Sequence, residues 1–242
     1  MKAVTSKLIT SKADGVGHII LNQPEKRNAI AYEMWQGIAV TADDYASDDS
    51  IRVVVISGAG DKAFSAGADI SQFAEKRSDK AATDDYNATV RKALEAVDRL
   101  GKPTIAMVQG FCVGGGMSLA THFDMRIASD DSRFGIRAAK LGLAYRWEDV
   151  RALVQLIGPT FTREILYTGL LFDATEAQQM GLVNRVMPQS ELQAFVRDYA
   201  ARIAANAPLT VRSVEGTVNQ VLKDPAARDI AQVERLIAAC FA

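Results

Sequence analysis

The sequence predicts an α/β fold in which strand–strand–helix units repeat through the first half of the chain and helices dominate the second half. Two apolar runs, 53–56 and 104–108, have the length and apolar composition of buried strands. Each run leads into a loop that contains glycine, and a helical apolar period lies between the two runs. After Glu148 the apolar residues recur mostly with the period of a helix. Alternation of this kind favours an α/β architecture over an all-α or all-β one.

The elements can be assigned in chain order. The first two strands, 7–10 and 16–21, form a predicted hairpin because Asp14-Gly15 between them is a typical turn pair. The helix near the middle of the chain keeps its apolar residues on one face and ends before Gly101-Lys102-Pro103. Helices are expected, in order, over 32–46, around 90–100, along the apolar stripe 192–203, over 210–222 and over 226–242.

The composition is that of one enzyme-sized domain. The 242 residues are 48% apolar and 24% charged, which is enough apolar material for a sizeable core. A net charge of −1 with scattered lysines and arginines does not favour nucleic acid or an anionic membrane as a partner. The two cysteines, Cys112 and Cys240, are far apart in sequence, so we expect a reducing, cytoplasmic location without a disulfide framework. The apolar runs have strand length, so no membrane span is expected.

Two glycine-bearing loops carry the strongest functional signal. Residues 64–70 follow the first buried strand, and residues 110–117 follow the second. Small side chains let a backbone approach a ligand closely, and Gly115-Gly116 opens an apolar helical stretch with free N–H groups at its start. Both loops leave neighbouring strand ends, so two backbone N–H groups can meet at one ligand oxygen. Such a pair of donors suits a developing oxyanion.

Five segments, in this order, carry a family resemblance: Leu21–Ile30, Ala63–Ile70, Lys102–Gly116, Phe123–Ala128 and Ala177–Val186. Together they resemble the crotonase (enoyl-CoA hydratase/isomerase) superfamily. No single segment is decisive, but five segments in register over nearly the whole chain are a specific pattern.

The resemblance implies a fold, an assembly and a substrate class. Residues 1–190 would form a spiral of β-β-α units that carries the coenzyme A and oxyanion site. Residues 191–242 would form a helical region that builds homotrimers, which in this family often pair into hexamers. The substrate would be an acyl-CoA thioester, with coenzyme A present as part of the substrate, no permanently bound cofactor and no metal.

The resemblance also assigns site residues. The main-chain N–H groups of Ala68 and Gly115 would hold the thioester oxygen. The coenzyme A moiety would be bound, largely through main-chain groups, at Lys26, Arg27, Ala29, Ala66, Asp69 and Ile70. The side chains of Lys26 and Arg27 also offer cations for phosphates, although exposed loop charges of this kind need no ligand.

Two departures from the family pattern bear on the reaction. Hydratases of the family carry one catalytic glutamate two residues after the last glycine of the triple and another a few residues beyond the Phe-Gly pair. Here these positions hold Ser118 and Ala138. Neither side chain can act as a carboxylate base. Because general acid–base groups commonly contribute about 10² to 10⁴ each, hydration by the usual route is expected to be weak.

Tyr145 indicates a different reaction. It falls where the superfamily's methylmalonyl-CoA decarboxylases resemble this segment and carry an active-site tyrosine. Decarboxylation of a malonyl-type thioester needs an oxyanion hole and a group that orients the carboxylate, but it needs no base. The same tyrosine is also consistent with a half-buried amphipathic side chain at a helix start.

Three functions therefore stay open. They are decarboxylation with Tyr145, hydration or isomerisation with a relocated acid/base, and acyl-CoA binding without catalysis. Glu148 and Asp149 are interpreted first as acids that complement a helix dipole, with Glu148 as the alternative candidate for a relocated base.

Other features are expected to be structural. Cys112 is interpreted as a core thiol, and His18 and His122 as histidines without metal-ligand company. The charged stretch 75–85 is interpreted as a solvated surface segment. The segment Gly58–Ala63 formally fits a dinucleotide-binding fingerprint, but loop residues follow it where a helix should open, so an NAD-dependent oxidoreductase is not favoured.

Overall fold

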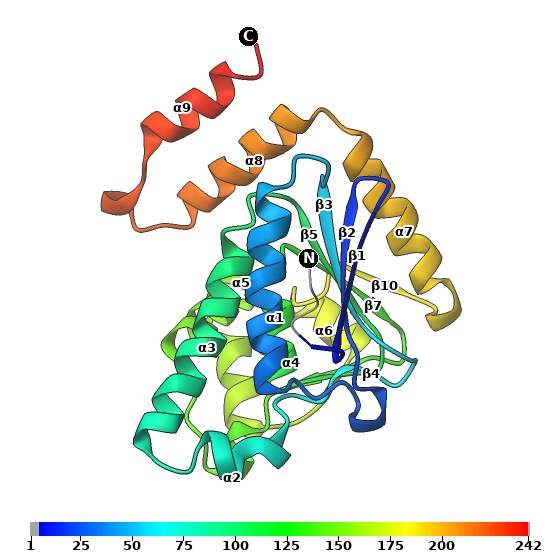
Figure 1. Ribbon diagram of the computed structural model, residues 1–242, viewed down its shortest axis with the longest axis vertical. Helices are drawn as coiled ribbons and strands as arrows, with labels where there is room; N and C mark the ends of the chain where they lie inside the picture. Colours follow the sequence, from blue (N-terminus) through cyan, green and yellow to red (C-terminus); the bar gives the residue numbers. More distant parts are fainter. Residues whose placement is uncertain (1–4, 242) are drawn as a thin grey trace.

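The computed structural model describes residues 5–241 as two β-sheets with helices packed around them (Figure 1). The larger sheet has the strand order β1-β2-β3-β5-β7-β10 and the smaller one the order β4-β6-β8-β9. Their strands are β1 Leu8–Ala13, β2 Val16–Leu21, β3 Val53–Gly58, β4 Ala63–Ser65, β5 Thr104–Val108, β6 Phe111–Val113, β7 Met125–Ser129, β8 Arg133–Gly135, β9 Phe172–Asp173 and β10 Arg185–Met187. All neighbouring pairs are parallel except β1 with β2 and β8 with β9. The mixed α/β fold predicted from the sequence is confirmed.

Helices connect the strands and then continue alone to the end of the described chain. They are α1 Tyr32–Ser47, α2 Phe73–Lys76, α3 Lys80–Asp98, α4 Gly115–Thr121, α5 Trp147–Thr168, α6 Ala174–Gln179, α7 Gln189–Ala205, α8 Pro208–Val221 and α9 Ile230–Ala238. The short 3-10 turns Pro24–Lys26, Ile70–Gln72, Ala138–Leu141 and Pro225–Ala227 lie in the connections. The predicted hairpin is also present, with positive φ angles of 51° at Asp14 and 78° at Gly15, the conformation that a two-residue hairpin turn favours.

The first four residues of β3 are apolar because both faces of the strand are covered. Val54 and Ile56 belong to the larger core, which also contains the buried residues of α1 and α3. Val53 and Val55 belong to a second core with the apolar stripe of α7. Figure 1 shows α1 and α3 on one side of the sheet and α7 on the other. A parallel strand between two helical layers needs apolar side chains in both directions, and each fully buried valine or isoleucine contributes about 1.5–3 kcal/mol.

Helices α8 and α9 extend away from the sheets at the end of the chain (Figure 1). They pack on each other where Gly216 of α8 lies against Leu236 of α9, with no room for a side chain at Gly216. Their exposed apolar residues include Leu209, Val214, Val218, Val221 and Ile230. These surfaces fit the helical region expected from the resemblance, but the trimer contact stays a prediction. Helix α7, which lies almost wholly within the predicted 191–242 region, packs on the larger sheet.

The crossing from β5 to β6 depends on Gly110, which holds β6 beside β4. Its φ is +58°, and a Cβ placed there would collide with the carbonyl oxygen of Lys62. We therefore expect Gly110→Ala to lower the free energy of unfolding by at least about 3 kcal/mol, the sum of a left-handed backbone and overpacking.

Gly142 offers a matched control for this substitution. It has a similar φ of +64° but nothing within 4 Å of a built Cβ, so Gly142→Ala should cost about 1–2 kcal/mol. Urea unfolding of both variants measures the difference. Equal losses of stability would show that the close packing at Gly110 is unimportant.

Candidate functional site

The predicted oxyanion donors lie next to each other at adjacent strand ends. Strands β4 and β6 pair in parallel, so the loops that leave their carboxyl ends are neighbours. Ala68 lies in the loop after β4, and Gly115 is the first residue of α4 after β6. A methyl group on Gly115 would lie 3.4 Å from the Ala68 nitrogen, and one on Gly67 would lie 3.5 Å from the Gly115 nitrogen. The close approach explains why the segment needs glycine.

Both amides belong to partly buried residues and have no protein acceptor within residues 5–241. Within residues 5–241, neither the N–H of Ala68 nor that of Gly115 donates a hydrogen bond to another protein atom. The neighbouring amides are occupied, because Gly67 donates to Ser65 Oγ at 3.1 Å and Gly114 donates to the Gly135 carbonyl at 2.9 Å. Ala68 and Gly115 are each only partly buried. This arrangement leaves two adjacent donors available to one ligand oxygen.

The six predicted coenzyme A positions come together in one pair of segments. Residues 26–30 and 66–70 run side by side, joined by hydrogen bonds from the Ile30 amide to the Gly67 carbonyl (2.7 Å) and from the Asp69 amide to the Ile30 carbonyl (3.0 Å). Lys26 Nζ contacts the buried Asp69 carboxylate at 2.9 Å. This cation and the hydrogen bonds from Ser71 lower the pKa of Asp69, against the effect of burial. The loop is therefore braced beside the oxyanion donors.

Among the coenzyme A candidates, exposure differs from residue to residue. Lys26, Arg27, Ala66 and Ile70 are exposed, whereas Ala29 and Asp69 are buried. The main chain at Ala66 is already tied to Arg27, because its amide donates to the Arg27 carbonyl at 2.9 Å. The exposed members lie on the outside of the paired segments, where a large cofactor moiety has access.

A buried carboxylate lies against the serine that stands in place of the first glutamate. Asp149, near the start of α5, is 3% exposed and accepts a hydrogen bond from the Ser118 hydroxyl through one oxygen. Its other oxygen accepts from Arg146 Nε at 2.8 Å. Ser118 lies on α4, one turn beyond Gly115, so this carboxylate is close to the oxyanion donors. Asp149 lies in the first turn of α5, as interpreted from the sequence, but its burial against Ser118 was not expected.

Sequence reasoning missed Asp149, although a signal was present. Asp149, Leu153 and Ile157 recur at intervals of four residues, and all three are buried on one face of α5. An acidic residue in register with the apolar face of a helix is a candidate for a buried, functional carboxylate. Glu148, the residue considered as a relocated base, is exposed instead.

Tyr145 and Ala138 lie at the edge of the same region. Both are partly buried and pack against the larger core. Burial raises the pKa of Tyr145 well above its ordinary value, and the negative charge of Asp149 raises it further. The phenol is therefore protonated at neutral pH and can act as a hydrogen-bond donor.

The residues expected to be structural are placed as such. Cys112 is fully buried in the larger core, and burial raises the pKa of its thiol, so the nucleophilic thiolate is disfavoured. His122 Nδ1 contacts Asp98 at 2.8 Å, and burial lowers the pKa of His18. The segment Gly58–Ala63 passes from β3 directly into β4, so the dinucleotide fingerprint opens no helix and that interpretation is wrong.

The charged stretch 75–85 is only partly a solvated segment. It spans the end of α2 and the first turns of α3, and most of its side chains are exposed. Arg77 is among its partly buried residues, and its guanidinium carbon lies 4.3 Å from the ring centroid of Phe73 and 4.8 Å from that of Tyr86. The expectation of a solvated stretch is therefore wrong at this residue.

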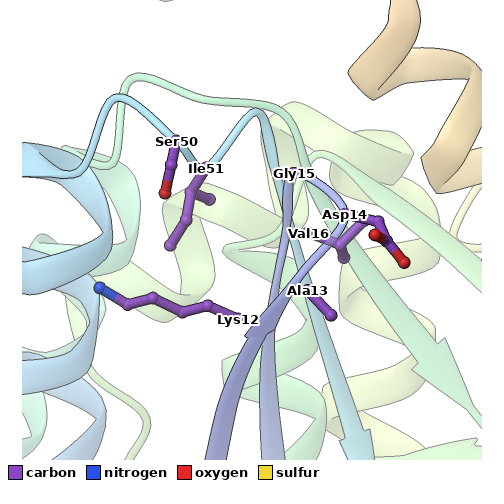
Figure 2. Close-up of a pocket in the computed structure, with 7 residues that line it drawn as sticks. All are labelled: Lys12, Ala13, Asp14, Gly15, Val16, Ser50 and Ile51. Atoms are coloured by element: carbon purple, nitrogen blue, oxygen red, sulfur yellow. The ribbon is translucent and has the colours of Figure 1, made fainter.

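A hollow of about 180 Å³ lies elsewhere, at the turn between β1 and β2 (Figure 2). It is lined by residues 12–16, which form the turn and the amino end of β2. Ser50 and Ile51, which precede β3, complete the lining. Lys12 projects from it toward α1 and contacts Asp44 and Asp48 at 2.7 Å each. Segment 26–30 follows the opposite, carboxyl end of β2, and segment 66–70 follows β4, so the hollow is separate from the candidate site.

Comparisons with known proteins agree with this geometry. A family model described as Enoyl-CoA hydratase/isomerase matches residues 11–242. A crotonyl-CoA hydratase from Syntrophomonas wolfei is 32% identical over 237 residues, which cover 97% of this chain and 90% of that protein. A carnitinyl-CoA dehydratase from Proteus mirabilis is 36% identical over 197 residues, covering 81% and 74% respectively. The crystal structure of an enoyl-CoA hydratase/carnithine racemase from Magnetospirillum magneticum superposes with a TM-score of 0.91 at 34% identity, covering 96% of this chain and 86% of that one.

Within residues 5–241, the helices all fall short of the length and apolarity that crossing a membrane requires.

Proposed function

The chain belongs to the enoyl-CoA hydratase/isomerase family, and we propose that it acts on an acyl-CoA thioester through an enolate whose oxygen is held by the amides of Ala68 and Gly115. The observation that carries this proposal is the pair of adjacent amides, partly accessible and without a protein acceptor within residues 5–241. Removing a proton or a carboxylate beside a thioester places negative charge on the thioester oxygen. Two preorganised donors stabilise that charge without reorganising water.

The coenzyme A moiety would bind across the paired segments 26–30 and 66–70. Lys26 and Arg27 are exposed there and provide positive charge for phosphates. Main-chain groups near Ala66 and Ile70 would complete the contact. Coenzyme A thus enters as part of the substrate.

Asp149 is the acid/base that we propose for hydration or isomerisation. Its carboxylate is buried beside Ser118, so it supplies a base near the position from which the family glutamate is absent. In this mechanism Asp149 removes the proton from the α-carbon of the acyl group, and the electron pair moves to the thioester oxygen. The proton is then returned to another carbon of the acyl chain, or the same carboxylate activates a water molecule for addition to a 2-enoyl thioester. Two hydrogen bonds hold the carboxylate and leave it further lone pairs for the proton.

A second candidate function is decarboxylation of a malonyl-type thioester. It is favoured by Tyr145, whose raised pKa keeps a phenolic donor beside the site. In this reaction the bond from the α-carbon to the carboxylate breaks, carbon dioxide leaves, and the electron pair again moves to the thioester oxygen.

A mass-spectrometric screen tests the proposal. The purified chain is incubated in D₂O with 2-enoyl, saturated and malonyl-type CoA thioesters. Proton transfer predicts deuterium at the α-carbon, and hydration predicts a gain of water on enoyl substrates. Decarboxylation predicts loss of carbon dioxide from malonyl-type substrates. A chain that binds these thioesters and converts none of them would be an acyl-CoA binder, and the catalytic proposal would be wrong.

Tyr145→Phe separates the two reactions. If the phenol orients a carboxylate, the substitution should lower kcat on malonyl-type thioesters by about 10- to 100-fold, the value of a hydrogen bond to a charged group. Turnover of 2-enoyl thioesters should change little. Tyr167, which is 74% exposed on α5, provides the matched control Tyr167→Phe. An unchanged kcat on every active thioester would remove the role of Tyr145.

A further inference from the structure

A buried donor on Arg77 has no acceptor within residues 5–241. The guanidinium carbon of Arg77 lies over the rings of Phe73 and Tyr86, at 4.3 Å and 4.8 Å from their centroids, and the two rings meet edge to face at 6.2 Å. Its Nε is buried, and within residues 5–241 it makes no hydrogen bond and no ion pair. A buried unsatisfied N–H typically costs about 1–3 kcal/mol, and more on a charged group. An acceptor that enters from outside the chain would remove this cost.

The other charged groups near Arg77 already have partners. Lys76 contacts Glu75 at 2.8 Å, and Arg146 contacts Asp149 at 2.8 Å. Asp85 accepts a hydrogen bond from the Tyr32 hydroxyl at 2.7 Å. Within residues 5–241, Arg77 itself forms no ion pair with a carboxylate.

Arg77 belongs to the same surroundings as the proposed catalytic groups. Tyr86, over whose ring Arg77 lies, is buried, and burial raises the pKa of its phenol, while polar contacts with Trp35 and Arg77 and the positive charges of Arg77 and Arg146 oppose that rise. Arg146 holds Asp149. On the other side, Trp35 lies close enough to Tyr86 to lower its pKa, and Trp35 Cζ2 would lie 3.7 Å from a Cβ on Gly115. Aromatic and cationic groups thus connect the oxyanion donors to Arg77.

From this arrangement we propose that the preferred substrates are CoA thioesters of short dicarboxylic acids, with Arg77 binding the terminal carboxylate. The proposal rests on the proposed acyl-CoA function and adds the class of acyl group. A planar guanidinium matches a carboxylate in shape, and the two aromatic rings beside it limit its hydration. A neutral acyl chain would leave Arg77 Nε without an acceptor, whereas a terminal carboxylate would supply one.

Pairs of thioesters of equal length test the proposal. Binding of glutaryl-CoA and pentanoyl-CoA to the full chain is measured by isothermal titration calorimetry, and the comparison is repeated with succinyl-CoA against butanoyl-CoA and adipyl-CoA against hexanoyl-CoA. We expect the carboxylated member of at least one pair to bind about 10-fold more tightly or better. Arg77→Gln should abolish this preference and leave the Kd of the neutral member within about 2-fold.

Two further variants control for structural effects. Arg99, an exposed arginine next to the end of α3 that contacts Glu95 at 3.6 Å, can be changed to glutamine without an effect on either ligand. Arg77→Lys keeps the charge but loses the planar guanidinium, so it should retain part of the preference for the carboxylated thioester. Thermal melting checks that each variant is folded.

The measurements distinguish a failure of the Arg77 proposal from a failure of the proposed acyl-CoA function. If neutral thioesters bind and no carboxylated thioester is preferred, or if Arg77→Gln weakens both members of a pair equally, Arg77 is a structural arginine only and this proposal is wrong. If none of the six thioesters binds, the acyl-CoA function itself is wrong.

Discussion

Gly115→Pro is expected to lower kcat by about 10² to 10³ on any thioester that the protein converts, because it removes one of the two proposed oxyanion donors. Gly115 is the first residue of α4, where a proline ring fits the helical φ and no intrahelical hydrogen bond is lost. Within residues 5–241 the amide has no acceptor, so the fold loses no hydrogen bond either. The loss should therefore fall on catalysis.

Gly115→Ala is the matched control because alanine places the same Cβ near Ala68 but keeps the N–H. That Cβ would stand 3.4 Å from the Ala68 nitrogen, an ordinary contact, so a loss of about 10-fold or less is expected. Steady-state kinetics on the best substrate of the screen measures both variants, and circular dichroism checks their folding. Equal rates for the proline and alanine variants would contradict the role of the Gly115 amide.

Asp149→Asn is expected to lower proton transfer at the α-carbon by about 10² to 10⁴, the usual contribution of a general base. Asparagine keeps an oxygen that can accept a hydrogen bond from Ser118 or Arg146, so the local packing should survive. The rate is measured as deuterium incorporation at the α-carbon in D₂O. A decarboxylation activity, if present, needs no base and should be affected much less by this substitution.

Glu148→Gln supplies the control for Asp149→Asn. It removes the same charge from the neighbouring residue of α5, but Glu148 is exposed and should not affect the rate. Ser118→Ala should lower the rate less than Asp149→Asn, because it removes only the hydrogen bond that positions the carboxylate. If Asp149→Asn exchanges deuterium as fast as the unchanged protein, Asp149 is not the base.

The sequence was sufficient to predict β1, β2, β3 and β5, whereas the short strands β4 and β6 fall in segments that were expected as loops. Residues 53–56 of β3 are all apolar, and the structure places them alternately in two cores because helices cover both faces of the sheet. The Asp14-Gly15 pair encodes its turn through backbone conformation alone. Such features depend on local propensity and on the periodicity of apolar residues, both of which are present in the sequence itself.

The sequence pattern placed Ala68 and Gly115 in two loops that follow buried strands. Their adjacency depends on the parallel pairing of β4 with β6, which follows from the tertiary structure. The resemblance supplied the roles of these two residues, and the structure supplied their distance and their free amides.

What the sequence determined by itself was the α/β class, the order of the predicted elements and the absence of glutamate at positions 118 and 138. Only the tertiary structure decided that Asp149 is buried against Ser118 and that Arg77 lies over the rings of Phe73 and Tyr86, with its Nε unpaired among residues 5–241. The physical reason is that periodicity describes one element at a time. Burial and charge pairing are properties of side chains that distant elements bring together.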